Sequence, residues 1–175
     1  MSEPTLVTGA NPPRTKTRDP SPEQTSRRPA PGFEIRTELI SLATRDRVEL
    51  INLTPQLQEV VRASGLRRGI VLVNSLHTTL ALFINEWQEA LLDDIRRFLE
   101  QMVVREEYWK HNDPRFSDCD RSNADAHLRA LLLGHNLVLQ LQEGELVRGT
   151  FQSVILAELD GPRERTLQVQ ILGTS

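Results

Sequence analysis

Cysteine is almost missing from this chain, because Cys119 is the only one among 175 residues. A single cysteine cannot form an internal disulfide. Long apolar runs are missing as well: none approaches the roughly 18 residues that a transmembrane helix needs, and the N-terminus has no apolar stretch of the signal-peptide type. From these absences we expect a cytoplasmic protein that has no membrane partner.

Several well-known catalytic motifs are also absent. The chain contains no P-loop, no glycine-rich dinucleotide fingerprint, no nucleophile elbow and no HExxH. Lysine is scarce, since Lys16 and Lys110 are the only two, so arginine supplies nearly all of the positive charge. A hydrophobic content of 38% and a net charge of -3 are typical of an ordinary globular protein with one core.

Proline is concentrated at one end, with seven of the ten prolines in the first 31 residues. Residues 1–32 also carry five basic and three acidic side chains, a net charge of +2 that leaves −5 for the remainder. Such a segment can neither build a helix nor bury apolar surface, so we predict a disordered tail over 1–32 and a single domain over 33–175. A basic tail can contact nucleic acid, but a solvated leader is favoured, and we expect no nucleic-acid partner.

Apolar periodicity predicts more strands than helices. Alternating or β-branched stretches predict strands, and the short turns at the C-terminal end suggest that the last three strands are antiparallel neighbours. The predicted strands cover 33–42, 47–53, 69–75, 79–85, 136–141, 151–159 and 165–172. The helices interrupt these strands rather than alternating with them. This order favours an α+β fold with a largely antiparallel sheet or sandwich and two or three flanking helices.

Capping patterns place the predicted helices. Thr54 with the following proline starts a short helix that ends near Gly65. Asn85 is the expected N-cap of the clearest helix, which carries one apolar stripe. That stripe consists of Leu91, Ile95, Phe98, Leu99 and Met102. A last helix runs from Ser122 or Asn123 to about Leu133, with a capping-box spacing at its start.

Three histidines are the first candidates for chemistry. His77 follows a strand, His111 lies in the polar segment 108–127, and His127 lies in the first turns of a helix and points to its buried face. Histidines that converge from these three places would suit zinc or another borderline divalent metal. The spacing matches no recognised finger, so a turn histidine at 77 and a satisfied core histidine at 127 remain open alternatives.

The polar segment 108–127 adds acidic side chains. Asp113, Asp118 and Asp120 are candidate partners for the histidines, or they solvate an exposed loop. Cys119 is a candidate thiolate ligand, although an incidental cysteine is favoured. Without a metal, nearby carboxylates would raise the imidazole pKa values, whereas a metal requires neutral imidazoles.

A second cluster surrounds a glycine turn near the C-terminus. Glu158 and Asp160 share a face while the strand persists, and Arg163 and Arg165 share a face on the next strand. Because the guanidinium fork matches phosphate geometry, this turn could hold an anionic substrate. A hairpin with surface ion pairs is the equally weighted alternative.

Five segments together resemble a known family. They are "NSLHTTLALFINEW", "YWKHND", "NADAHLRALLLG", "GELVRGTFQSVILAELDGPR" and "VQILG". In this order, from about Phe33 to Gly173, they resemble the YjbQ-like family, which is also called the secondary thiamine-phosphate synthase family. Two positions depart from its pattern: Phe151 stands where tryptophan is usual, and His135 stands where a small hydroxyl residue is common.

The resemblance implies a fold, an assembly and a reaction. It implies a compact α+β or sandwich-like homotrimer with sites near the subunit boundaries. The implied reaction joins a hydroxymethylpyrimidine diphosphate to a thiazole phosphate and releases pyrophosphate. The family's three histidines correspond to His77, His111 and His127. Its acidic glycine turn corresponds to Glu158, Asp160, Gly161 and Arg163.

The leading hypothesis is a metal-assisted enzyme that acts on a phosphorylated small molecule. A divalent metal, zinc or magnesium-like, at the three histidines would neutralise phosphate charge or activate water. Arg163 would clamp the phosphate, with Gly161 and Thr78 as further phosphate-binding candidates, and Glu158 or Asp160 would be the acid–base group. The alternatives are a metal-dependent hydrolase and a non-catalytic trimeric module that binds an anion or a partner and uses the histidines for a structural metal.

Overall fold

The computed structural model describes residues 32–175, so nearly all of the tail predicted over 1–32 lies outside the described residues. The elements follow in chain order. They are β1 (Glu34–Ala43), β2 (Glu49–Asn52), α1 (Thr54–Ser64), β3 (Arg68–Ser75), β4 (Leu80–Glu86), α2 (Glu89–Met102), the 3-10 helix η1 (Lys110–Asn112), α3 (Ala124–Leu133), β5 (Asn136–Gln142), β6 (Glu145–Val147), β7 (Gln152–Glu158) and β8 (Glu164–Thr174). No helix among residues 32–175 is long and apolar enough to cross a membrane.

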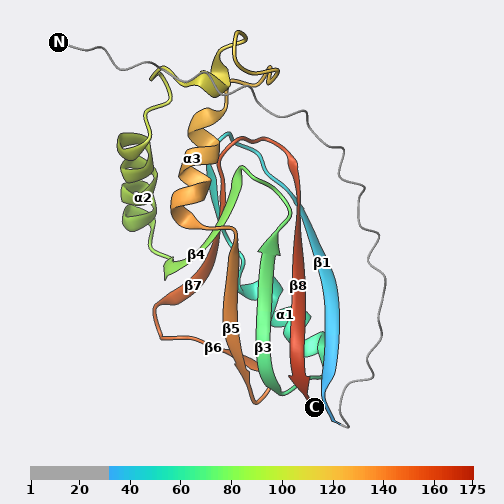
Figure 1. Ribbon diagram of the computed structural model, residues 1–175. Helices are drawn as coiled ribbons and strands as arrows, with labels where there is room; N and C mark the ends of the chain where they lie inside the picture. The colour runs from blue at the N-terminus through green and yellow to red at the C-terminus, as the bar shows by residue number, and fades with distance from the viewer. Residues whose placement is uncertain (1–31) are drawn as a thin grey trace, which may run out of the picture.

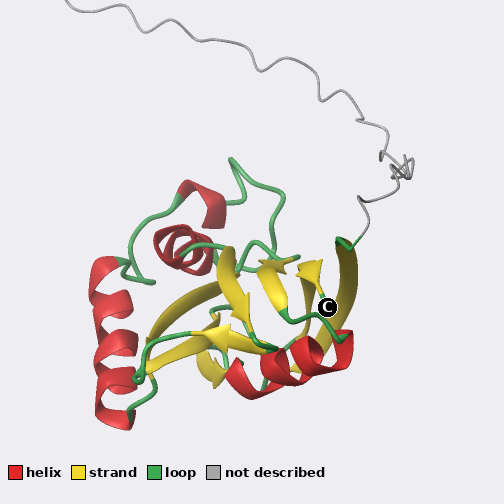
Figure 2. Cartoon of the chain, turned by 90° about the horizontal axis from the view of Figure 1, so that it is seen from below, coloured by secondary structure: helices red, strands yellow, loops and turns green. Residues whose placement is uncertain are grey.

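The strands form two antiparallel sheets. One has the order β1-β8-β3-β5-β6, and the other has the order β2-β7-β4. The predicted α+β fold with a largely antiparallel sandwich is therefore confirmed. Figures 1 and 2 show α2 and α3 together on one side of the strands, with α1 apart from them.

The three-stranded sheet is the middle layer, because side chains on both of its faces are buried. Leu80 and Leu82 of β4 pack in one apolar cluster with the five-stranded sheet and α1. Ala81, which points the other way, packs in a second cluster with α2 and α3. Burial on both faces explains why β4 and β7 are continuous apolar runs in the sequence.

The prediction that the last three strands are mutual neighbours was wrong. β5 pairs with the short strand β6, whereas β7 pairs with β2 and β4, and β8 pairs with β1 and β3. The turn after β7 therefore carries the chain from one sheet to the other instead of closing a hairpin. Sequence patterns indicated a tight turn correctly, but a short turn does not show whether the chain stays in one sheet.

Two predicted N-caps were wrong, although α1 begins at Thr54 as predicted. Asn85 lies inside β4, and the N-cap of α2 is Gln88, whose side-chain oxygen accepts a hydrogen bond from the Leu91 N–H at 2.8 Å. The hydroxyl of Thr54 does not cap α1 but accepts the Val154 N–H of β7 at 2.9 Å. That bond ties the start of α1 to the middle sheet.

The helix α3 begins without the expected capping box. Its N-cap is Asn123, which makes no side-chain hydrogen bond to the helix backbone. The Asn123 amide donates instead to Asp160 at 2.8 Å. Asp125, the expected box partner, is fully buried and pairs with Arg47 and Arg129. The Asn123 side chain therefore joins α3 to the turn after β7 instead of capping the helix.

The predicted apolar stripe of α2 is buried over only part of its width. Leu99 is buried, and Ile95 packs against the same cluster, but Phe98 and Met102 are 55% and 56% exposed. Leu92, which lay outside the predicted stripe, is buried instead. The helix therefore contacts the middle sheet through a face rotated from the one predicted.

Candidate functional site

A pocket of about 370 Å³ lies where four connecting regions meet, and we call it the polar pocket. The β3–β4 turn, the loop that carries η1, the start of α3 and the segment between β7 and β8 all contribute to it. Its lining residues are Leu76, His77, Thr78, Thr79, His111, Cys119, Arg121, Asn123, His127, Asp160, Arg163 and Arg165. The structure thus brings six predicted site residues together, namely His77, Thr78, His111, His127, Asp160 and Arg163.

His111 and His127 form a pair at this pocket. Their ring centroids are 5.0 Å apart, and the rings are nearly perpendicular at 85°. Partial burial lowers the pKa of His127, and the neighbouring His111 charge lowers it further, against the opposing effect of Asp160 and Asp125. The neutral form of His127 is therefore favoured near neutral pH.

His77 lies in the β3–β4 turn and uses one ring nitrogen within the fold. The backbone N–H of Thr166 on β8 donates to His77 Nε2 at 2.9 Å. A nitrogen that accepts a hydrogen bond carries no proton, so the proton of the neutral ring is on Nδ1. Burial lowers the pKa of His77, as does the charge of Arg165, while Glu158 opposes them. His77 is thus a neutral histidine with an engaged Nε2.

These positions do not fit the predicted three-histidine metal site as arranged. Within residues 32–175, no group of three or more His, Cys, Asp or Glu side chains is placed to hold a metal ion. His111 and His127 are close together, but His77 Nε2 is already bonded to the backbone of β8. The divalent metal stays a prediction.

Glu158 is a buried partner of Arg165 and does not line the polar pocket. The Arg165 guanidinium donates to both Glu158 oxygens, at 2.6 and 2.5 Å, and its Nη2 also lies 3.0 Å from the Thr79 hydroxyl. The same carboxylate accepts the Asp160 N–H and the Thr44 hydroxyl. Burial raises the pKa of Glu158, but these hydrogen bonds outweigh it and hold the pKa below its usual value.

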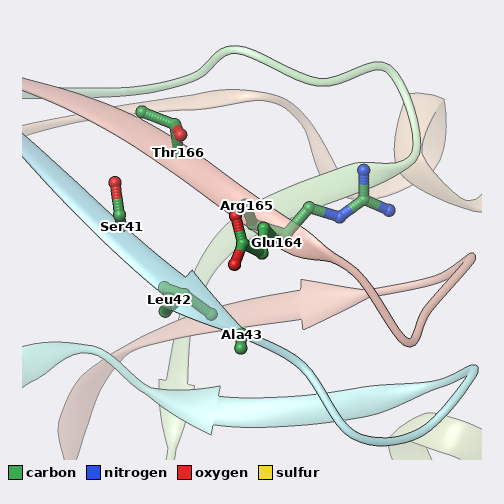
Figure 3. Close-up of a pocket in the computed structure, with 6 residues that line it drawn as sticks. All are labelled: Ser41, Leu42, Ala43, Glu164, Arg165 and Thr166. Atoms are coloured by element: carbon green, nitrogen blue, oxygen red, sulfur yellow. The ribbon is translucent and has the colours of Figure 1, made fainter.

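Arg165 also borders a second, smaller depression of about 190 Å³ between the end of β1 and the start of β8. Figure 3 shows its guanidinium reaching away from Ser41 and Thr166, which line that depression. The charge is directed instead toward Glu158. The small depression is therefore not the place where the Arg165 charge acts.

Asp160 gathers several cations at the wall of the polar pocket. Its side chain is only 2% exposed and accepts hydrogen bonds from Arg121, Arg163 and the Asn123 amide at 3.1, 3.1 and 2.8 Å. Arg47 contacts its other oxygen at 3.3 Å. One buried carboxylate thus positions three guanidinium groups, and the side chains of Arg121 and Arg163 are 46% and 32% exposed.

Gly161, predicted to bind phosphate, lies in a tightly packed turn next to the polar pocket. It is absent from the pocket lining, and its N–H donates to the Arg47 carbonyl at 3.0 Å. A Cβ at this position would lie 2.3 Å from the Asp46 carbonyl oxygen and 2.9 Å from the Thr44 hydroxyl. The glycine allows the β7–β8 connection to pack against the β1–β2 turn.

Sequence reasoning missed Arg47, Arg121 and Asn123. Arg121 and Asn123 belong to the polar segment 108–127, in which histidines and aspartates are the more obvious candidates for chemistry. Arg47 lies in a predicted strand and joins Asp125 of α3 to Asp160, a connection for which the sequence holds no local signal. Phe151 and His135 are outside the pocket lining, so neither departure from the family pattern alters its wall.

Comparison with known proteins agrees with this geometry. A family model described as "UPF0047 protein YjbQ-like" matches residues 38–174. The chain belongs to this family. A UPF0047 protein from Methanothermobacter thermautotrophicus is 42% identical over 141 residues, which make up 81% of this chain and 94% of that relative. A UPF0047 protein from Archaeoglobus fulgidus is 43% identical over 133 residues, covering 76% and 98% of the two chains.

Two solved structures share the fold. A YbjQ-like protein of unknown function from Sulfolobus solfataricus matches with a TM-score of 0.75 at 38% identity, over 81% of this chain and 99% of that one. A hypothetical protein from Aeropyrum pernix matches with a TM-score of 0.72 at 32% identity, over 79% and 98%. The predicted family and fold are thereby confirmed.

Proposed function

We propose that the polar pocket binds a phosphorylated small molecule and that the chain is a thiamine-phosphate synthase. One observation carries the binding proposal: Asp160 holds Arg121 and Arg163 at the pocket wall with their guanidinium groups partly exposed. Each guanidinium has five N–H donors, and Arg163 spends two of its donor groups on Asp160. Among residues 32–175, the other N–H groups of the Arg163 side chain have no hydrogen-bond partner, so they can meet phosphate oxygens, whose geometry the planar fork matches.

The reaction is taken from the family resemblance, and the arginines suit it. The thiazole nitrogen attacks the methylene carbon of the pyrimidine diphosphate, a C–N bond forms, and the C–O bond to the diphosphate breaks. The electron pair of that bond leaves with pyrophosphate. Preorganised cations at the place where this negative charge develops lower the barrier. No proton has to move at the reacting atoms, so we assign Glu158 and Asp160 to positioning the arginines rather than to acid–base catalysis.

The test is an assay of purified protein with hydroxymethylpyrimidine diphosphate and thiazole phosphate. We expect thiamine phosphate and pyrophosphate in equal amounts, and a loss of about 100-fold or more in kcat for Arg163→Met. Arg62→Met, on an exposed side chain of α1 that pairs with Glu145, is the matched control. Absence of product, or equal activity of Arg163→Met and wild type, would contradict the proposal.

The same assay distinguishes the synthase from the two alternative functions. Phosphate released from the diphosphate without the thiazole would favour the hydrolase, and tight binding without turnover would favour the non-catalytic module. The metal is tested by elemental analysis of wild type and of a variant with His111 and His127 both changed to alanine, with His135→Ala as the control. Metal that is lost only from the double variant would support a site at the histidine pair.

The proposal includes the cytoplasmic location expected from the sequence and the homotrimer that the family resemblance implies. Apolar side chains on one face of the five-stranded sheet support self-association. Ile35 and Leu172 are register partners, and Leu172 also pairs with Ile70 on the next strand. Ile35 and Ile70 are 53% and 42% exposed. Exposed apolar side chains that lie side by side mark interaction surfaces, and we assign this face to contact with another copy of the chain.

A further inference from the structure

A second pocket, of about 340 Å³, shares a wall with the polar pocket, and we call it the apolar pocket. It is lined by Trp109, Lys110, His111, Ala124, His127 and Leu128. His111 and His127 line both pockets. The nearly perpendicular histidine pair therefore stands between a compartment rich in arginine and a compartment that contains none.

The indole of Trp109 is held in place as a wall of the apolar pocket. Its only polar atom, Nε1, donates to the Val104 carbonyl at 3.0 Å. Because that N–H is satisfied within the chain, the rest of the indole is left as aromatic surface. Lys110 does not bring its charge into the compartment, since its Nζ lies over the Phe116 ring, 5.5 Å from the centroid.

Each compartment alone is at the small end of ligand pockets, which are about 300–1,000 Å³. Together they suit a small molecule with two unlike parts. Guanidinium groups in the polar pocket select a phosphate, and an aromatic and aliphatic wall selects an uncharged ring. Aromatic rings gain by stacking beyond the area that they bury.

We propose that Trp109 and Leu128 are the specificity-determining residues of this site, and that they bind the uncharged planar ring of a ligand whose phosphate lies in the polar pocket. This inference rests on the proposed function, because it requires the polar pocket to bind phosphate. It goes further by naming the residues that determine which phosphorylated molecule binds. It also places the histidine pair beside the atoms that join the ring to the phosphate.

The test compares three probes by calorimetry on the full chain: phenyl phosphate, methyl phosphate and inorganic pyrophosphate. We expect phenyl phosphate to bind about tenfold more tightly than methyl phosphate. Trp109→Leu should abolish that preference while leaving pyrophosphate binding unchanged. Leu128→Ala, a milder change, should reduce the preference without affecting methyl phosphate. Trp87→Leu, which removes the chain's other tryptophan from outside both pockets, should keep it.

The outcomes distinguish the two proposals. Equal binding of phenyl and methyl phosphate to wild type, with both lost in Arg163→Met, would overturn the ring site and keep the phosphate site. A preference that survives in both Trp109→Leu and Leu128→Ala would also overturn the ring site. If neither phosphate probe nor pyrophosphate binds, the proposed function and this inference fail together.

Discussion

At the scale of single residues, Glu158, a carboxylate predicted for catalysis, is buried in an ion pair with Arg165. It is fully buried and accepts from both ends of the Arg165 fork. Removing one partner of a buried pair leaves the other charge uncompensated, at a cost of about 3–5 kcal/mol. We expect Glu158→Ala to lose stability of that size in urea unfolding. Glu164→Ala, an exposed neighbour, should change it by less than about 0.5 kcal/mol; similar midpoints for the two variants would refute this role.

The lowered pKa of His77 predicts how the stability of the fold depends on pH. Its folded pKa lies below the ordinary value of 6.5, so the unfolded chain takes up the proton more readily. The stability that His77 contributes is therefore fully present above pH 6.5 and is lost as the pH falls toward the folded pKa. In His77→Gln the side-chain oxygen can still accept the Thr166 N–H but does not titrate. We expect the melting temperature of this variant to depend less on pH than that of wild type.

The measurement is scanning calorimetry between about pH 5 and pH 7.5, the range in which histidines titrate. His127, whose pKa is also lowered, contributes with the same sign, so the His77→Gln curve flattens only in part. His135→Gln, outside both pockets, serves as the control. A His77→Gln curve parallel to that of wild type would show that the Thr166 bond does not depend on the neutral ring.

Residue types and spacing predicted many of the side chains that line the polar pocket. They did not predict the ion pairs that hold those side chains in place. Histidines and an arginine beside a glycine turn are unusual enough to be noticed in the sequence, and His77, His127 and Arg163 were found that way. Arg47 was not, because its two partners follow it by 78 and 113 positions. Only the fold brings them together, and no local pattern encodes an ion pair across such a separation.

At the scale of elements, the corner between β7 and β8 matters most, because it joins the two sheets and carries the site. Gly161 packs there with no room for a side chain. We expect Gly161→Ala to destabilise the fold by about 1–3 kcal/mol, as overpacking does, and to weaken pyrophosphate binding because Asp160 immediately precedes it. Gly149→Ala, whose Cβ would meet its nearest neighbour at an ordinary 3.5 Å, is the control. Equal unfolding midpoints for the two alanine variants would contradict this account.

Elements were easier to predict than their pairing. Strand and helix positions follow from apolar periodicity within about ten residues, and β3, β4 and α3 lie close to their predicted places. Pairing depends on which faces must be buried. β7 is apolar on both sides, so it belongs in the middle layer between the larger sheet and the helices. Burying both faces of β7 requires contacts with elements from the whole chain. This burial overrides the preference of a short turn for a hairpin.

At the scale of the whole molecule, the five-stranded sheet has one face in the core and one outside. Leu39 and Val138, like Ile35 and Ile70, are exposed there, at 62% and 60%. A sheet face with this many apolar side chains is stabilised when another surface covers it. If three copies associate through it, the particle mass is three times 19.9 kDa, about 60 kDa.

We expect light scattering on purified wild type to give that trimer mass. Changing Leu39 and Ile70 together to arginine places two charges on the covered face, where burying an unpaired charge is costly, and should shift the mass to that of the 19.9 kDa monomer. The matched control puts arginine at Phe98 and Met102, two exposed apolar positions of α2, and should leave the trimer intact. A monomeric wild type would remove the assembly from the proposal, and dissociation of the α2 variant alone would move the contact from the sheet to the helix layer.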